Sequence, residues 1–305
     1  MKIAALLGAG FSRWSSDLPL VGELFDFNIE PDTDVEKRRV SRLKKKYDAW
    51  RIKHPTGNNE AFIASSQRDD GKFCLVNWYV TRRLADPFVI NHGRRYTWYI
   101  NSYHPRQHEG VNKARSLIDT LLAISELEKL GIITTNYDLL AEYALGTRAF
   151  NYGKVGEQIG FTPYPYPKPI FVTGNVPIAK LHGSISWDQE RKYPDSRCGL
   201  TGKCLIVPPV SEKTAPKSLK FQWKLAKEML SSCDKLIVFG FAFNEYDTAI
   251  RKFIAKSLHK AAEILIVDVV DHRKRVALLL KNHEMKFIDA TSVDVLNKIS
   301  AALNS

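Results

Sequence analysis

The sequence MKIAALLGAGFSRWSSDLP, residues 1–19, holds the element around which the rest of the chain is organised. Ile3–Leu7 is a short apolar run typical of a buried strand, and it ends in the motif Gly8-Ala9-Gly10-Phe11-Ser12. Two glycines at the end of a strand let backbone N–H groups approach a phosphate, although the same pattern also occurs in simple tight turns. Arg13 stands where the dinucleotide fingerprint of dehydrogenases has its third glycine. The stretch therefore predicts a nucleotide-binding turn of another kind.

The composition is that of an ordinary globular protein. Of 305 residues, 44% are hydrophobic and 26% are charged, which suits one large domain with an insertion or two smaller domains. No apolar run approaches the roughly 20 residues that span a bilayer, and the run after Lys2 is short for a signal peptide and interrupted by glycines. The four cysteines are scattered along the chain, which favours a reducing compartment without disulfides. We therefore expect a cytoplasmic protein without a membrane segment.

The chain is strongly basic. A formal net charge of +12 suits contact with a polyanion, such as nucleic acid, an acidic partner subunit or the phosphates of a nucleotide. Residues 36–54 predict a helix with one apolar face, and basic residues are concentrated between Arg38 and Lys46. This basic stretch predicts either a solvated helix face or a contact with nucleic acid.

Apolar strands alternate with amphipathic helical patterns over most of the chain. Further strands are predicted over residues 132–135, 178–181, 204–207, 235–239, 263–267 and 285–288, and helices over 112–124, 219–230, 249–254, 275–281 and 293–303. This alternation predicts an α/β fold with a parallel sheet covered by helices on both faces. Residues 23–112 lack clear strands and predict a mainly helical, basic insertion, so that residues 1–22 and 113–305 form the core.

Small, polar or ionisable residues follow several of the predicted strands. Asn and Asp at such places are also common in turns and helix caps. Ligands of parallel sheets, however, bind outside the carboxyl ends of the strands, and the agreement of several strand ends favours a common site. The residues concerned are Asn136, Tyr137, Asp138, His182, Ser184, Gly240, Asn244, Asp247 and Asp268.

Taken in order, these motifs resemble the sirtuin (SIR2-like) family. The resemblance is closest to the bacterial SIR2-like branch found in antiphage systems that deplete NAD, and it covers most of the chain except residues 23–112. The motifs that carry it are Gly8-Ala9-Gly10-Phe11-Ser12, Leu18-Pro19, Thr134-Thr135-Asn136-Tyr137-Asp138, Lys180-Leu181-His182-Gly183-Ser184, Ile206-Val207-Pro208-Pro209 and Phe239-Gly240 through Asp247.

The resemblance implies a Rossmann-like NAD-binding core with NAD as the substrate. It makes His182 the catalytic base and Asn136 the residue that positions water or ribose, and it places Asp138 beside the nicotinamide ribose. Asp268 would accept hydrogen bonds from the adenosine ribose. The remaining cofactor-binding residues that it implies are Gly8, Ala9, Gly10 and Ser12 around the phosphates, and Gly240 and Ala242 under the adenosine half.

The chemistry of NAD cleavage suits these residue types independently. Breaking the nicotinamide–ribose bond produces an oxocarbenium-like centre and needs a base to activate a nucleophile or a ribose hydroxyl. A histidine such as His182 titrates near neutrality, and a carboxamide such as Asn136 can both donate and accept a hydrogen bond. The alternative for His182 is a buried structural histidine bonded to backbone.

The sequence offers little for a metal ion. Cys198 and Cys204 are the closest cysteine pair, but they lack the Cys-x-x-Cys spacing and no second pair exists, so we expect none of the structural zinc of deacylating sirtuins. His104 and His108, with Glu109, have helical metal spacing, but Pro105 favours a loop there.

Three departures from the sirtuin pattern move the prediction away from lysine deacylation. The deacylase motif Gln-Asn-Ile-Asp is Thr135-Asn136-Tyr137-Asp138 here. The aspartate-phenylalanine-arginine element that follows the glycine turn is missing, and Ala242 replaces a common serine. These differences favour water as the acceptor, and thus hydrolysis of NAD.

The sequence therefore predicts an NAD hydrolase that yields nicotinamide and ADP-ribose, with a role in antiphage defence implied by the resemblance. A toxic activity of this kind needs restraint, so we expect a homo-oligomer or a partner defence subunit that contacts the basic insertion. Two alternatives are an NAD-dependent lysine deacylase and a non-catalytic sensor of NAD or ADP-ribose. A further alternative is a nucleic-acid-binding protein that uses the basic stretch between Arg38 and Lys46.

Overall fold

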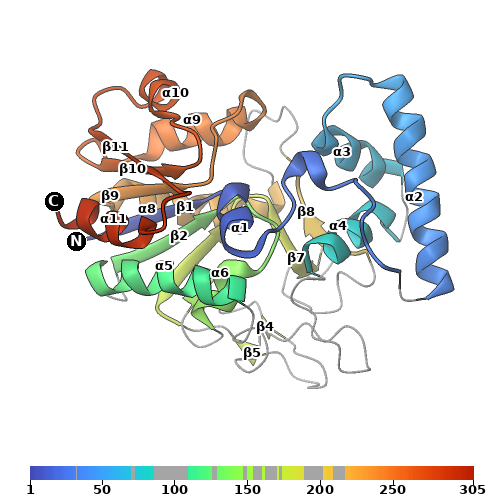
Figure 1. The fold of residues 1–305 in the computed structure, drawn as a ribbon, viewed down its shortest axis with the longest axis horizontal. Helices are drawn as coiled ribbons and strands as arrows, with labels where there is room; N and C mark the ends of the chain where they lie inside the picture. The colour runs from blue at the N-terminus through green and yellow to red at the C-terminus, as the bar shows by residue number, and fades with distance from the viewer. Residues whose placement is uncertain are drawn as a thin grey trace.

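The computed structural model describes residues 1–31, 33–69, 73–85, 109–125, 129–146, 150–153, 160–161, 170–171, 174–188, 202–208 and 217–305. Figure 1 shows a sheet with its helices on one side of the molecule and a group of three helices, α2 to α4, on the other. Among the described residues, no helix has the length and hydrophobicity that a membrane crossing requires.

The centre of the fold is a seven-stranded sheet in the order β11-β10-β9-β1-β2-β6-β3, and every pairing in it is parallel. Strand β1 lies in the middle, and all its residues are buried because helices cover both faces of the sheet. The strands are β1 (Ile3–Leu7), β2 (Leu130–Thr134), β3 (Phe150–Asn151), β6 (Val176–Lys180), β9 (Lys235–Phe239), β10 (Glu263–Asp268) and β11 (Met285–Asp289).

Helices pack on both faces of this sheet (Figure 1). One layer is built around α5, which contacts α1, α6 and α11, and the other contains α8 and α9. The helices are α1 (Ala9–Ser16), α5 (Glu109–Ser125), α6 (Leu140–Leu145), α8 (Lys220–Ser232), α9 (Thr248–Ser257), α10 (Arg273–Leu279) and α11 (Val295–Asn304). The predicted α/β class, with a parallel sheet between two helical layers, is therefore confirmed.

Two local predictions were wrong. The strand expected over residues 132–135 begins earlier, at Leu130, so that Gly131 lies inside β2, where a Cβ atom would come within 2.7 Å of the Met229 Sδ. The strand β8 (Cys204–Ile206) was expected in the parallel sheet, but it pairs antiparallel with β7 (Gly183–Asp188) in a sheet of its own. Gly183, with φ of +82°, makes this possible because it turns the chain away from the main sheet directly after His182.

The remaining elements are short. Strands β4 (Gly160–Phe161) and β5 (Ile170–Phe171) form an antiparallel pair. Three 3₁₀-helices are described as well, η1 (Val21–Glu23), η6 (Lys217–Leu219) and η7 (Glu245–Asp247).

The described part of the predicted insertion is helical. Its helices are α2 (Asp34–Lys53), α3 (Asn59–Asp69) and α4 (Leu75–Ala85). Aromatic rings hold this helical part together: buried Phe25 stacks on half-buried Tyr47 and on buried Tyr79, at centroid distances of 5.1 and 5.7 Å. Helix α4 contacts β7 and β8, which links the helical part to the sheet. The boundary between core and insertion near residue 112 stays a prediction.

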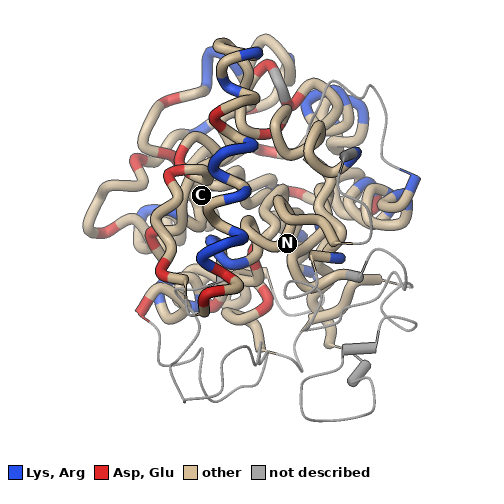
Figure 2. Tube along the Cα trace, turned by 90° about the vertical axis from the view of Figure 1, so that its right-hand side faces the viewer, with Lys and Arg blue, Asp and Glu red and all other residues tan. Residues whose placement is uncertain are grey.

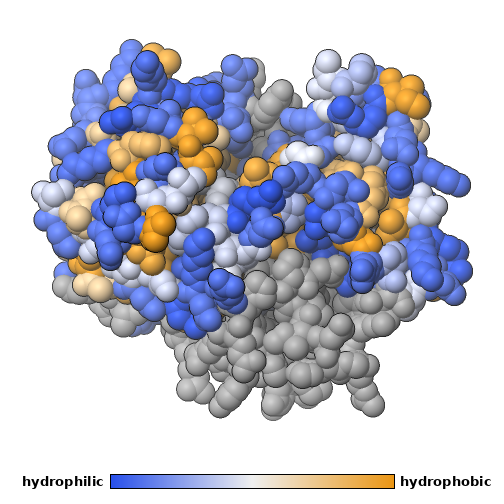
Figure 3. Space-filling model, in the orientation of Figure 1, coloured by the Kyte–Doolittle hydropathy of each residue, from blue (hydrophilic) through white to orange (hydrophobic). Residues whose placement is uncertain are grey.

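The surface of the helical part is strongly charged. Figure 2 marks Lys and Arg positions in blue along α2, which lies on the side that faces the viewer in that view. Figure 3 shows a mostly hydrophilic surface with small apolar patches. Most of the basic residues between Arg38 and Lys45 are exposed. Binding of nucleic acid by this face stays a prediction.

Candidate functional site

A pocket of about 1110 Å³ opens at the carboxyl ends of the parallel strands and extends to the helical part of the chain. Its volume slightly exceeds the usual range for small-molecule sites, roughly 300–1,000 Å³. Of the ten site residues that the resemblance implies, nine line this pocket: Ala9, Gly10, Ser12, Asn136, Asp138, His182, Gly240, Ala242 and Asp268. Gly8 is not among the lining residues, but its carbonyl oxygen accepts a hydrogen bond from Asn136.

The glycine turn allows the loops after β1 and β9 to touch. The Gly10 N–H donates to the Gly240 carbonyl at 2.9 Å, and the Gly8 N–H donates to the Phe239 carbonyl at 2.9 Å. A Cβ atom on Gly10 would lie 2.7 Å from the Gly240 Cα, and Gly240 itself has a φ of +63°. These two N–H groups are used within the protein, so the positive end of α1, which begins at Ala9, is the feature that remains for a phosphate.

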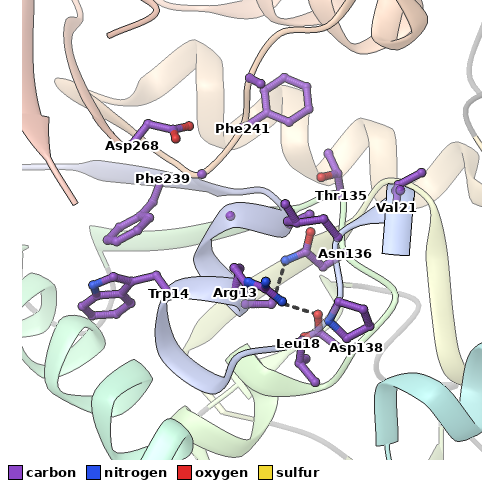
Figure 4. A pocket seen from close by; sticks show the side chains of 18 of the residues that line it. Arg13, Trp14, Leu18, Val21, Thr135, Asn136, Asp138, Phe239, Phe241 and Asp268 are labelled. Carbon is purple, nitrogen blue, oxygen red and sulfur yellow. Dashed lines mark hydrogen bonds between the residues drawn. The ribbon is translucent and has the colours of Figure 1, made fainter. Parts of the chain in front are cut away.

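Three buried polar side chains form a chain of hydrogen bonds beside α1 (Figure 4). The Asn136 Nδ2 donates to the Gly8 carbonyl and to the Ser12 Oγ, both at 2.8 Å. The Ser12 Oγ in turn donates to the Asp138 Oδ2 at 2.8 Å, and the Leu140 N–H donates to the Asp138 Oδ1 at 3.0 Å. Because both amide hydrogens of Asn136 are used, its amide oxygen is the group that it can offer to a ligand. The sequence had suggested that Asn136 both donates to and accepts from a ligand. In the structure its side chain can only accept a hydrogen bond from a ligand.

A buried ion pair stabilises the loop that carries Asn136 and Asp138. Lys180, at the end of β6, pairs its Nζ with the Glu142 Oε1 at 2.9 Å, and both side chains are 0% exposed. The Lys180 Nζ also donates to the Asp138 backbone carbonyl, and the Tyr152 hydroxyl donates to the Glu142 Oε1 at 2.9 Å. The network fixes Asp138 from the backbone side while Ser12 fixes its carboxylate. Sequence reasoning missed it, although a lysine next to an apolar strand was the available signal.

His182 follows β6 and faces the pocket from a nearly dry position, 7% exposed. Burial lowers the pKa of its imidazole to about 4, and a hydrogen bond with the Thr135 backbone only partly offsets this. The ring lies 6.2 Å from the Tyr137 ring, centroid to centroid. His182 is therefore neutral at physiological pH, with an acceptor nitrogen available to a bound hydroxyl or water.

Asp268 lies at the other end of the pocket, at the end of β10 and away from Asp138 (Figure 4). Its Oδ1 accepts from the Val269 N–H at 2.7 Å, and its Oδ2 lies 3.8 Å from the His272 Nε2. The Ala242 carbonyl accepts from the Arg275 Nη1 at 2.8 Å. Exposed apolar side chains of Val269 and Val293 flank this end of the pocket. A carboxylate beside apolar groups suits a ribose diol with an attached base.

Two carboxyl groups in the pocket have strongly perturbed pKa values. Burial and the charge of Asp247 raise the pKa of Glu60 to about 8, and burial raises the pKa of Asp247 to about 6 against the opposing effect of Arg251. The sequence had placed Asp247 near a strand end, but it gave no sign of Glu60, which comes from the first turn of α3. Such perturbed groups in a cleft mark a functional region.

The cysteines give no support for a zinc site. Cys74, Cys204 and Cys233 are buried, reduced and on separate elements, while Cys198, His104 and His108 lie outside the described residues. In the described ranges no three His, Cys, Asp or Glu side chains gather as metal ligands would. The expectation that zinc is absent stays a prediction.

Comparison with known proteins gives distant structural similarity only. No protein-family model and no curated protein matches the chain. Among solved structures, Sir2Tm bound to a propionylated peptide is 13% identical, with 99% of this chain and 91% of that chain covered at a TM-score of 0.43. A Sir2–p53 peptide–NAD⁺ structure is 14% identical, with 99% and 92% covered at a TM-score of 0.42. A structure on the mechanism and regulation of Sir2 enzymes is 14% identical, with 99% and 91% covered at a TM-score of 0.42. The chain is thus distantly similar to Sir2 structures along its whole length.

Proposed function

We propose that this protein hydrolyses NAD to nicotinamide and ADP-ribose. The observation that carries the proposal is the meeting of the Ser12–Asn136–Asp138 hydrogen-bond chain with His182 in one pocket, at the edge of the sheet where nucleotide ligands bind. The sequence motifs that contain these residues resemble those of sirtuins. The size of the pocket and the N-terminus of α1, which can face a phosphate, fit a dinucleotide.

In the proposed reaction, the bond between the ribose C1′ and the nicotinamide nitrogen breaks and a bond from C1′ to a water oxygen forms. NAD⁺ and water thus yield nicotinamide, ADP-ribose and a proton. Neutral His182 accepts the proton from the water or from a ribose hydroxyl, and the amide oxygen of Asn136 accepts a hydrogen bond from the same group. The Asp138 carboxylate accepts a hydrogen bond from Ser12, which holds it where it can stabilise the developing oxocarbenium ion.

The narrower parts of the proposal concern biology. By the resemblance of its motifs, the protein acts as an antiphage effector that depletes NAD in the cytoplasm. Its activity is restrained by homo-oligomerisation or by a partner defence subunit, which binds the basic helical region of residues 23–112. Lysine deacylation is the enzymatic alternative, and it requires an acylated peptide as a second substrate.

One observation favours a second candidate, a non-catalytic sensor of NAD or ADP-ribose. A histidine whose pKa is about 4 is a weak base, and a binding protein would need it only as a hydrogen-bond partner. The two functions differ in one respect, because a sensor binds NAD without consuming it.

The test is a comparison of NAD binding by calorimetry with nicotinamide release by chromatography. The wild type should bind NAD and release nicotinamide. His182→Ala should retain binding and lose about 100-fold or more of the release rate, which is the usual contribution of a general base. Asn136→Ala should lose both release and part of the binding. His259→Ala and Asn297→Ala, which change exposed residues outside the pocket, serve as matched controls.

Two outcomes would contradict the hydrolase proposal. Release that is unchanged in His182→Ala would remove His182 from the reaction. Tight NAD binding by the wild type without any release, also in the presence of an acylated peptide, would favour the sensor.

A further inference from the structure

The pocket continues past the nucleotide-binding residues to an acidic end that the proposed hydrolysis does not use. Glu60 from α3 and Asp247 from η7 line the same cavity from opposite sides, the first on the helical part and the second on the sheet part. Within the described ranges, neither carboxylate has a cation within ion-pair distance. Two carboxyl groups that share a partly buried site repel each other when both are ionised.

Tyr137 lies between this acidic end and His182. Its side chain is only 8% exposed, and its hydroxyl has no hydrogen-bond partner among the described residues. Burial and, after it, the charges of Glu60 and Asp247 raise the pKa of this hydroxyl, so it stays protonated and lies within electrostatic reach of both carboxylates. A buried hydroxyl without a partner costs free energy, which a ligand at this place would recover.

We propose that Glu60, Asp247 and Tyr137 form a second subsite, which binds the ammonium or guanidinium group of a ligand other than NAD. Such a group offers several N–H donors and no acceptor. The two carboxylates and the phenol oxygen can each accept one of these donors. The positive charge of the ligand balances the two carboxylates. His182 lines the same pocket, and its ring is 6.2 Å from that of Tyr137.

The other occupants fit less well. Ca²⁺ and Mg²⁺ prefer six or more oxygen ligands, whereas two carboxylates and a neutral phenol supply too few, and the described residues add no third metal-binding side chain. The phosphates of a nucleotide are repelled by the carboxylates. Small amines and the side chains of lysine or arginine peptides both carry the required group, so the experiment includes each source.

The subsite also predicts how binding depends on pH. Glu60, with a pKa of about 8, is largely protonated at pH 6, and a bound cation favours its ionised form. The charged groups that face the cluster are Arg251, which acts on Asp247 from α9, and Arg51, which lines the pocket and donates to the Gly57 carbonyl. Binding should therefore strengthen as the pH rises from 6 to 8.

The experiment is a titration of the full chain, labelled with ¹³C at Glu and Asp carboxyl groups, followed by NMR in the absence of NAD. The probes are n-propylammonium, methylguanidinium and an acetylated, amidated Gly-Lys-Gly peptide, with n-propanol as the neutral control and MgCl₂ as the metal control. Each probe is tested at pH 6 and pH 8. Because no nucleotide is present, the result does not depend on the proposed hydrolysis.

At least one of the cationic probes should bind at pH 8, about tenfold more tightly than at pH 6, while n-propanol does not bind. Glu60→Gln and Asp247→Asn should each weaken this binding about tenfold or more, and Tyr137→Phe should weaken it about threefold. Glu228→Gln, which changes an exposed acid outside the pocket, should leave it unchanged. Glu60→Gln removes the repulsion between Glu60 and Asp247, so we expect this variant to fold. A thermal unfolding curve of the variant tests that expectation.

Three results would overturn the proposal. The first is binding of the cations with equal affinity in the folded Glu60→Gln protein. The second is tighter binding of Mg²⁺ than of any ammonium or guanidinium probe. The third is a measured pKa near 4 for Glu60, because the carboxyl groups would then be separate and solvated. A response to the peptide alone identifies a lysine side chain as the source of the group, and a response to the small cations identifies a free amine.

Discussion

His182 enters the proposed reaction as a neutral imidazole, because burial lowers its pKa to about 4. A base is active only when it is deprotonated. The value of kcat/KM for nicotinamide release should therefore stay level from pH 8 down to pH 5, and fall only as the pH approaches 4. The measurement is a pH–rate profile of the wild type, with His259→Ala as the control for an exposed histidine. An acidic limb near pH 6.5 would contradict the dry environment of His182.

Asp268 should set the preference between NAD and NADP. Its carboxylate is 12% exposed and lies where the adenosine ribose is proposed to bind. A phosphate on that ribose would repel it, which costs about 1–2 kcal/mol or more in a partly solvated site. The wild type should thus prefer NAD, and Asp268→Asn should narrow the ratio of kcat/KM values for NAD and NADP about tenfold. A ratio that does not change in this variant would remove Asp268 from the ribose site.

At the residue scale, the sequence located the side chains that follow strands. Asn136, His182 and Asp268 could be assigned to one edge because parallel strands all end at the same edge of the sheet. Glu60 could not be found in this way. It lies in a helix whose contact with the pocket is determined by tertiary packing, and no local pattern distinguishes it from a solvated helix acid.

At the scale of elements, β6 and α6 are joined by the buried pair of Lys180 and Glu142. Lys180→Met removes one charge and leaves the other buried, which usually costs about 3–5 kcal/mol. We expect a loss of this size in the free energy of unfolding, measured with urea. The double variant Lys180→Met/Glu142→Leu should recover a large part of it, because no buried charge then remains unpaired.

Lys224→Met is the matched control for this prediction. Lys224 pairs with Glu228 at 4.0 Å on the surface, and exposed pairs contribute about 0–1 kcal/mol. If Lys180→Met were as stable as Lys224→Met, the buried pair would not support the Asp138 loop.

The elements themselves were predicted unequally. The buried central strands and the amphipathic helices α5, α8 and α9 follow from hydrophobic periodicity, because each buries one regular face. The antiparallel pairing of β8 (Cys204–Ile206) with β7 could not be predicted from periodicity. An apolar run does not show whether a strand will pair parallel or antiparallel. Helix α3 could not be predicted as a separate helix within the mainly helical insertion, because its apolar face is weak.

At the scale of the whole molecule, Glu60 and Asp247 couple the helical part to the sheet part across the pocket. The folded state holds the pKa of Glu60 near 8, above its usual 4.5, so the stability that protonated Glu60 contributes is complete below pH 4.5 and is lost as the pH rises through 8. Glu60→Gln should therefore match the wild type at pH 4.5 and be more stable at pH 8.5. We expect a gain on the order of 1–2 kcal/mol, reduced by the partial exposure of the site.

Urea unfolding of both proteins at pH 4.5 and pH 8.5 measures this gain. His182 contributes in the opposite direction, because its lowered pKa makes stability fall as the pH drops from 6.5 toward 4. Since His182 is present in both proteins, its contribution cancels in the difference. A difference that does not vary with pH would show that the two parts are not coupled through this carboxyl pair.

The central claim is that this pocket cleaves NAD with water. Its most direct test is to incubate the full chain with NAD, with and without an acetylated lysine peptide, and to measure nicotinamide and ADP-ribose by chromatography. The proposed function predicts equal amounts of the two products without any peptide, formed about 100-fold or more slowly by His182→Ala. Nicotinamide that appears only with the peptide, accompanied by an acetylated form of ADP-ribose, would contradict it.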